Sequence, residues 1–106
     1  MEQMTPAHVA ERFSEGWTPF ILDVRNEKEA AISALPRTDL LCPYDQLESV
    51  LDQLPRQGDL LIYCRSGGRS AIACAWLDAR GFEATINLDG GINEWARQVD
   101  PSLPVY

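Results

Sequence analysis

DLLIYCRSGGRSAIACAWLDAR, residues 59–80, is the stretch of the sequence that decides the fold. Its apolar run Leu60–Tyr63 is too short for a helix and is partly β-branched or aromatic, so it predicts a buried strand of the parallel type. A loop with two glycines follows. From about Arg69 the composition is helical as far as Gly81, a typical residue just past the end of a helix. The stretch therefore predicts a strand, a loop and a helix in direct succession.

Cys64 stands where the predicted strand ends and the loop Arg65-Ser66-Gly67-Gly68-Arg69 begins. The glycines relax the steric limit on φ and let several backbone N–H groups converge on one point, which forms an anion-binding nest. A sulfur atom that faces such groups at the N-terminus of a buried helix, with two arginines nearby, is favoured as thiolate over thiol. We therefore expect Cys64 to be a nucleophile whose thiol pKa lies below the free value of about 8.5.

The loop length favours sulfur over phosphate as the bound group. Four residues separate Cys64 from Arg69, and this loop resembles the active-site loop of the rhodanese-like sulfurtransferases. The cysteine-dependent phosphatases have one more residue here, which opens a cradle for a tetrahedral phosphate, whereas the shorter ring suits a single sulfur atom. Two further blocks match the same family, Asp23-Val24-Arg25 and Leu88-Asp89-Gly90-Gly91 followed by Trp95. The resemblance therefore extends over nearly the whole chain.

The resemblance implies a sulfurtransferase in which Cys64 carries the transferred sulfur as a persulfide. The Cys64 thiolate would attack the outer sulfur of a small anionic donor such as thiosulfate, or of a protein persulfide. A nucleophilic acceptor such as cyanide, a thiol or a sulfur-carrier protein would then attack the persulfide. The amides of Ser66 to Arg69 would hold the terminal sulfur, while Arg65 and Arg69 attract the donor. This chemistry requires no metal and no organic cofactor.

Asp23 and Arg25 are predicted to support the loop. They follow the predicted strand Pro19–Leu22, so they lie at the carboxyl end of an open α/β sheet, where binding crevices form. In the family that the chain resembles, the matching aspartate pairs with the arginine that closes the active-site loop. The resemblance thus implies an ion pair between Asp23 and Arg69. The alternative is that Asp23 is a surface carboxylate at a turn.

Residues 33–38 depart from the family pattern. The family usually has Gly-His-Ile-Pro-Gly-Ala there, but this chain has Ser33-Ala34-Leu35-Pro36-Arg37-Thr38, so the histidine is absent. Because that histidine is not the sulfur carrier, we expect its loss to affect the active-site entrance and the choice of substrate more than the reaction.

The rest of the chain alternates between helical and strand patterns. Helices are predicted over residues 6–15, in a turn within 26–37, over Tyr44–Leu54 and over Ile92–Ala96; strands are predicted over Pro19–Leu22, Leu40–Cys42 and Ala84–Leu88. Alternating elements with short connections predict an α/β fold with a parallel, doubly wound sheet and right-handed crossovers. The resemblance implies about five mostly parallel strands flanked by helices. Trp95, in the short helix Ile92–Ala96, is expected to pack against the sheet.

Length and charge narrow the class of protein. With 106 residues, 45% of them hydrophobic, the chain can enclose one core, so we expect a single domain over residues 1–106. The formal net charge of −7 argues against a surface for nucleic acid or for an anionic membrane. A small anion could still be drawn to a local cluster of arginines, because charges farther away than about 8 Å are largely screened.

The cysteines and the N-terminus indicate the compartment. Three cysteines without paired spacing or a Cys/His cluster predict reduced thiols, no disulfide framework and no metal site. Cys42 and Cys74 are expected to be packing residues. The first residues lack the basic and apolar regions of an export signal, and no apolar run approaches the ~20 residues of a membrane span. We therefore expect a cytoplasmic protein.

Two other functions stay open. The chain could be a noncatalytic rhodanese-like interaction module for a ubiquitin-like sulfur carrier or an adenylating enzyme, because its ending WARQVDPSLPVY is similar to those of domains appended to such enzymes. It could also be a relative of the phosphatases or arsenate reductases, which the loop length disfavours. The presence of Cys64 argues against a noncatalytic module.

Overall fold

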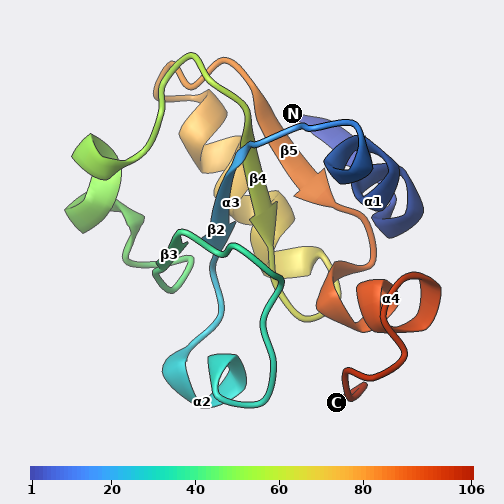
Figure 1. The fold of residues 1–106 in the computed structure, drawn as a ribbon. Coiled ribbons are helices and arrows are strands. Elements are labelled where there is room, and N and C mark those ends of the chain that lie inside the picture. Colours follow the sequence, from blue (N-terminus) through green and yellow to red (C-terminus); the bar gives the residue numbers. More distant parts are fainter.

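A five-stranded parallel sheet with helices on both faces forms the protein in the computed structural model, which describes residues 1–106 (Figure 1). The strands are β1 (Glu2–Met4), β2 (Phe20–Asp23), β3 (Leu40–Leu41), β4 (Leu60–Tyr63) and β5 (Thr85–Leu88). They lie in the order β1-β5-β4-β2-β3, and each neighbouring pair is parallel. The predicted α/β fold with about five mostly parallel strands is confirmed.

β4 lies in the middle of the sheet, and all of its residues are buried. Leu60 and Ile62 belong to one core cluster, and Leu61 and Tyr63 to the other, because successive side chains of a strand point to opposite faces. The first core includes residues of α3 (Gly68–Asp78) and of the 3-10 helix η1 (Leu47–Gln53). The second includes residues of α1 (Pro6–Ser14) and α4 (Gly91–Gln98), among them Trp95 as predicted. Coverage of both faces explains why this strand is apolar throughout.

Local signals in the sequence set the helix ends. Thr5 caps α1, since its hydroxyl accepts a hydrogen bond from the His8 N–H at 3.2 Å and Pro6 follows it. The short helix α2 (Glu27–Ala30) begins with a capping box, in which the Asn26 side chain accepts from the Glu29 N–H and the Glu29 carboxylate accepts from the Asn26 N–H. This box fixes Glu29 beside the carboxyl edge of the sheet, where α2 and α4 both lie (Figure 1).

Two elements differ from the sequence-based predictions. The helix predicted over Tyr44–Leu54 is a 3-10 helix over Leu47–Gln53, without a side-chain cap. Pro43 and Pro55 flank this segment, and 3-10 turns are frequent in short connecting segments. β1 was not predicted because only one of its three residues is buried, which is too short a pattern to show a period.

Cys42 and Cys74 pack in the first core, as predicted, with exposed fractions of 5% and 0%. Burial raises the pKa of the Cys42 thiol, and it raises the pKa of Cys74 to about 12. Neither thiol is therefore prepared for nucleophilic chemistry.

None of the helices has the length and apolar character that crossing a bilayer requires.

Candidate active site

Cys64 lies directly after β4, and the loop that it opens runs into the N-terminus of α3 at Gly68. The same edge of the sheet carries Val24 and Arg25, which follow β2, the neighbour of β4. Crossovers from the carboxyl ends of parallel strands leave a crevice at such an edge. The strand, loop and helix predicted from residues 59–80 thus place Cys64 at the edge of the sheet where binding crevices form in such folds.

Hydrogen-bond donors surround the Cys64 sulfur, although the residue is only 1% exposed. The Gly67 N–H lies 3.1 Å from Sγ, and the buried Ser70 hydroxyl lies 3.3 Å from it. Burial raises the pKa of the thiol, but hydrogen bonds from the Ser70 hydroxyl and from the N–H groups of Ser70, Gly67 and Ser66 together outweigh it. The thiol pKa of Cys64 therefore lies below its ordinary value. The predicted direction is confirmed, and hydrogen bonds rather than the arginines are its main cause.

Sequence analysis did not assign Ser70 to the site. Ser70 immediately follows the loop arginine and stands in the first turn of α3, where a short hydroxyl side chain can turn back toward the loop. A serine at that position next to a predicted nucleophile was the signal that could have identified it. Its hydroxyl can donate to the thiolate because Sγ then only accepts.

The first turn of α4 holds the loop in place. The Ile92 N–H donates to the Cys64 carbonyl at 2.9 Å, and the Asn93 N–H donates to the Arg65 carbonyl at 3.1 Å. Such N–H groups have no partner within their own helix. Gly91 has φ 66°, and a Cβ atom there would lie 2.4 Å from the Arg65 carbonyl oxygen, so the approach requires glycine. This contact explains why the matched block that contains Gly90-Gly91 is found together with the Cys64 loop in the same sequence.

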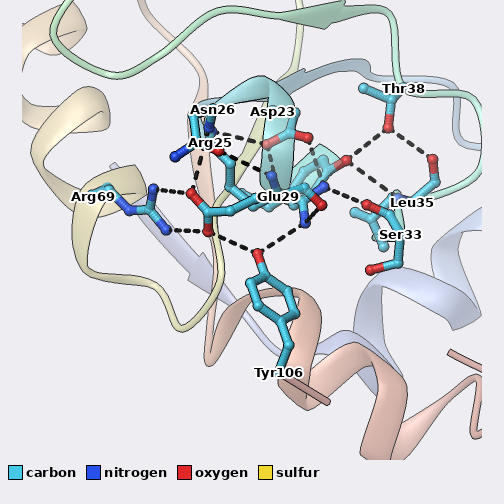
Figure 2. A network of polar contacts seen from close by, with 10 residues as sticks. Asp23, Arg25, Asn26, Glu29, Ser33, Leu35, Thr38, Arg69 and Tyr106 are labelled. Carbon is cyan, nitrogen blue, oxygen red and sulfur yellow. Dashed lines mark hydrogen bonds and ion pairs between the residues drawn. The ribbon is translucent and has the colours of Figure 1, made fainter. Parts of the chain in front are cut away.

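The ion pair predicted between Asp23 and Arg69 is wrong. Asp23 pairs with Arg25, whose Nη2 lies 2.8 Å from Oδ2 and whose Nε lies 2.9 Å from Oδ1. Arg69 pairs instead with Glu29, through contacts of 2.7 and 2.8 Å from its two Nη atoms (Figure 2). Residues two apart in an extended segment point to the same side, so Arg25 reaches Asp23 first. The capping box of α2 presents Glu29 to Arg69.

Tyr106 joins these two ion pairs (Figure 2). Its hydroxyl donates to Glu29 Oε2 at 2.8 Å and accepts from Arg25 Nη1 at 3.0 Å. The hydrogen bonds from Arg69 lower the pKa of Glu29 most, burial opposes them and Tyr106 adds to the lowering, so that this pKa is about 2. Glu29 and Tyr106 were not predicted as site residues.

The Asp23–Arg25 pair is buried, with exposed side-chain fractions of 1% and 0%. A buried ion pair is stable only with further hydrogen bonds, and Arg25 donates to the Ser33 carbonyl at 2.6 Å as well as to Tyr106. Burial lowers the pKa of Arg25, but hydrogen bonds to Asp23 and Tyr106 raise it by more, so its pKa lies above its ordinary value. Asp23 and Arg25 thus brace the edge of the sheet as a buried ion pair.

The two loop arginines have different surroundings. The charge of Arg69 is matched by the carboxylate of Glu29. Arg65 is exposed, has no ion pair, and places its guanidinium carbon 5.0 Å from the ring centre of Tyr106. Arg65 is therefore the cation of the loop that is free to meet an anionic ligand.

Residues 33–38 form a turn despite their departure from the family pattern. The Leu35 N–H donates to the Tyr63 hydroxyl at 3.2 Å, and the Thr38 hydroxyl donates to the Leu35 carbonyl at 2.7 Å. Arg37 stands where the family pattern has its second glycine, and its φ of 61° lies in the left-handed region. The chain thus keeps the conformation of a glycine at this position without the glycine.

Comparisons with known proteins agree with the three matched blocks. The sequence model of the family described as Rhodanese-like domain matches residues 5–98. A protein from Allochromatium vinosum named Sulfurtransferase is 35% identical over 97 residues, which cover 92% of this chain and 87% of that protein. A protein from Ogataea parapolymorpha named Adenylyltransferase and sulfurtransferase uba4 is 32% identical over 98 residues, 91% of this chain but only 25% of that protein.

The fold has close counterparts among solved structures. The crystal structure of a rhodanese-like domain protein from Staphylococcus aureus superposes with a TM-score of 0.84 at 27% identity, and the match covers 100% of this chain and 99% of that one. Asp23, the Cys64 loop and Gly91 all lie within the residues that the family matches, whereas Tyr106 lies beyond them.

Proposed function

Because this chain belongs to the rhodanese-like domain family, we propose that it is a sulfurtransferase in which Cys64 carries a sulfane sulfur as a persulfide. The main support is the surroundings of the Cys64 sulfur, where the Gly67 N–H at 3.1 Å and the Ser70 hydroxyl at 3.3 Å favour the thiolate. The other two thiols lie in the core and have raised pKa values. We take residues 1–106 as one domain, since a single sheet carries both cores.

The reaction has two steps, written here for thiosulfate. The Cys64 thiolate attacks the outer sulfur; the S–S bond of thiosulfate breaks, and sulfite leaves with the electron pair. Cys64 then carries a terminal sulfur with one negative charge. In the second step an acceptor such as cyanide attacks that sulfur, the S–S bond to Cys64 breaks, and thiocyanate leaves while the Cys64 thiolate is restored. Neither step takes up or releases a proton.

The loop residues have separate roles in this proposal. The N–H groups of Ser66 to Arg69 face the terminal sulfur and stabilise its charge. Arg65 attracts the anionic donor. Arg69 holds the loop against α2 through its pair with Glu29, and the Asp23–Arg25 pair supports the same edge from within.

A protein can also supply or accept the sulfur. The relative from Ogataea parapolymorpha carries adenylyltransferase and sulfurtransferase in its name, which supports a sulfur-carrier protein or an adenylating protein as partner for this chain. Three cysteines without a disulfide are typical of a compartment in which thiols stay reduced, so we place the protein in the cytoplasm. The lowered thiol pKa of Cys64 argues against a noncatalytic interaction module.

Mass spectrometry after incubation with thiosulfate tests the proposal. We expect the Cys64 peptide to gain about 32 Da, the mass of one sulfur atom, and to lose it again when cyanide is added and thiocyanate forms. A noncatalytic module would show neither change. A phosphatase would release phosphate from an aryl phosphate without gaining sulfur. Either of these two outcomes would refute the proposal.

A further inference from the structure

Tyr106 is fixed beside the active-site loop by its backbone. The Tyr106 N–H donates to Asn93 Oδ1 at 3.1 Å, and Asn93 Nδ2 donates to the main-chain oxygen of Tyr106 at 3.2 Å. Asn93 is itself only 7% exposed. Its own N–H donates to the Arg65 carbonyl at 3.1 Å. One asparagine thus binds the backbones of Tyr106 and Arg65 at the same time.

The side chain of Tyr106 is fixed at its other end as well. Its hydroxyl lies between Glu29 and Arg25, which are both held by ion pairs of their own (Figure 2). A ring anchored through both its backbone and its hydroxyl has little freedom to turn. Tyr106 therefore presents one defined ring face to Arg65 of the active-site loop.

Arg65 is the group that meets this ring. Its guanidinium carbon lies 5.0 Å from the ring centre, within the range of a cation–π contact. Arg65 makes no ion pair, so no carboxylate competes for its charge. A long exposed side chain otherwise samples many rotamers, and the aromatic contact selects those that keep the charge at the loop.

A local cation matters because the protein as a whole repels anions. The formal net charge is −7, and only charges within about 8 Å act strongly at physiological salt. The nearby charges of Arg25 and Arg69 are already paired. The attraction of an anion to Cys64 then depends on where Arg65 stands.

We propose that Tyr106 is a positioning residue for Arg65, whose guanidinium it holds at the loop so that the site selects anionic sulfur donors such as thiosulfate. The naming of a sulfur donor rests on the proposed function, whereas the selection of anions does not. The ring carries this role, and the hydroxyl serves only to anchor the ring. The two parts of one side chain can therefore be tested separately.

Alkylation of Cys64 tests the anion selection without any sulfur transfer. Iodoacetate is negatively charged and iodoacetamide is neutral, and both react with the same thiolate. The ratio of their rates, measured by mass spectrometry of the Cys64 peptide, is thus insensitive to changes in the thiol pKa. Tyr106→Leu should lower the ratio by about two- to fivefold, the range that a cation–π contact supports. Tyr106→Phe keeps the ring and should leave the ratio within about twofold of the wild type.

A double variant tests whether Tyr106 acts through Arg65. Arg65→Ala should lower the ratio at least as much as Tyr106→Leu does, and Arg65→Ala combined with Tyr106→Leu should lower it no further than Arg65→Ala alone. An unchanged ratio in Tyr106→Leu, or an additive fall in the double variant, would overturn the proposal. If Tyr106→Leu is unfolded, Arg65→Lys is the substitute, because lysine keeps the charge but stacks less well on a ring. A wild-type ratio in Arg65→Lys would also overturn it.

The same variants connect the inference to turnover. In the thiosulfate–cyanide assay, Tyr106→Leu should raise KM for thiosulfate by about two- to fivefold and change kcat less, as expected for lost ground-state attraction. A fall in kcat alone would contradict the positioning role. If the wild-type protein forms no persulfide at all, the proposed function fails, and the alkylation ratio still decides the role of Tyr106.

Discussion

The loop after β4 and the segment after β2 lie at the same edge of the sheet but use polar groups in opposite ways. The loop and the start of α3 direct the Gly67 N–H and the Ser70 hydroxyl at the Cys64 sulfur. The charge of the Cys64 thiolate stays available for reaction. The segment after β2 contains Arg25 and Glu29, and the charges of both are paired, Arg25 with Asp23 and Glu29 with Arg69. Charges near a reactive group are therefore no guide to catalysis until their partners are known. In this site they mostly hold the edge of the sheet together.

Replacement of Cys64 should have the largest effect. Cys64→Ser should abolish both persulfide formation and sulfur transfer, because only this thiol lies within the ring of donors. Cys42→Ser and Cys74→Ala change buried packing residues and should each keep at least about a tenth of the transfer rate. The thiocyanate assay and the mass of the Cys64 peptide measure these effects. Turnover by the Cys64→Ser protein would show that the nucleophile lies elsewhere.

Gly91→Ala should destabilise the protein, because residue 91 in α4 packs against the Cys64 loop. Its Cβ would lie 2.4 Å from the Arg65 carbonyl oxygen in a residue with φ 66°, so the clash adds to the backbone strain. We expect a loss of about 2–4 kcal/mol in the free energy of unfolding, measured in urea. Gly16→Ala is the matched control, because φ there is 92° and no atom lies within 4 Å of the added Cβ. That variant should lose only about 1–2 kcal/mol. Equal losses would mean that the loop yields to the clash.

Ser70→Ala should raise the thiol pKa of Cys64, because the hydroxyl stabilises the thiolate. The rate of alkylation by iodoacetamide against pH gives this pKa, and its midpoint should move to higher pH in the variant. At neutral pH less thiolate is then present, and alkylation is slower. Ser66→Ala is the control, since Ser66 acts through its backbone N–H and its midpoint should stay in place. A midpoint unchanged in Ser70→Ala would remove Ser70 from the site.

Substitutions in the Glu29–Arg69 ion pair should have a smaller effect. Glu29→Gln and Arg69→Ala should each lower the free energy of unfolding by about 0.5–2 kcal/mol, since the pair is partly exposed to solvent. In a double-mutant cycle their effects should couple by about 0.5 kcal/mol or more. The cycle of Asp23→Asn with Arg69→Ala should couple less than the first, because these two side chains make no direct contact and are linked only through Arg25, Tyr106 and Glu29. Coupling in the second cycle but not in the first would reverse the assignment of partners.

The same contrast explains how much the sequence could predict. The strand, the loop and the helix around Cys64 depend on local features: an apolar run, two adjacent glycines and a helical composition. Glu29 lies 40 residues from Arg69 and 77 from Tyr106, and no periodicity relates residues so far apart. The resemblance supplied the right arginine with the wrong partner, because Arg25 stands two residues from Asp23 and reaches it first.

β1 and η1 show the same limit of prediction from sequence. Four strands were predicted from their own apolar residues, whereas β1 is held by its backbone pairing with β5 and has a single buried side chain. The spacing of the leucines in η1 fits an α-helix as well as a 3-10 helix, so it could not predict the 3-10 form. What depends on distant partners had to be seen in the structure.

A single turnover with thiosulfate labelled in its outer sulfur tests the central claim most directly. The account predicts about one label per protein molecule, located on the Cys64 peptide, and its full release as labelled thiocyanate after cyanide is added. Label on Cys42 or Cys74, or thiocyanate formed without a labelled protein, would contradict the claim that Cys64 carries the sulfur.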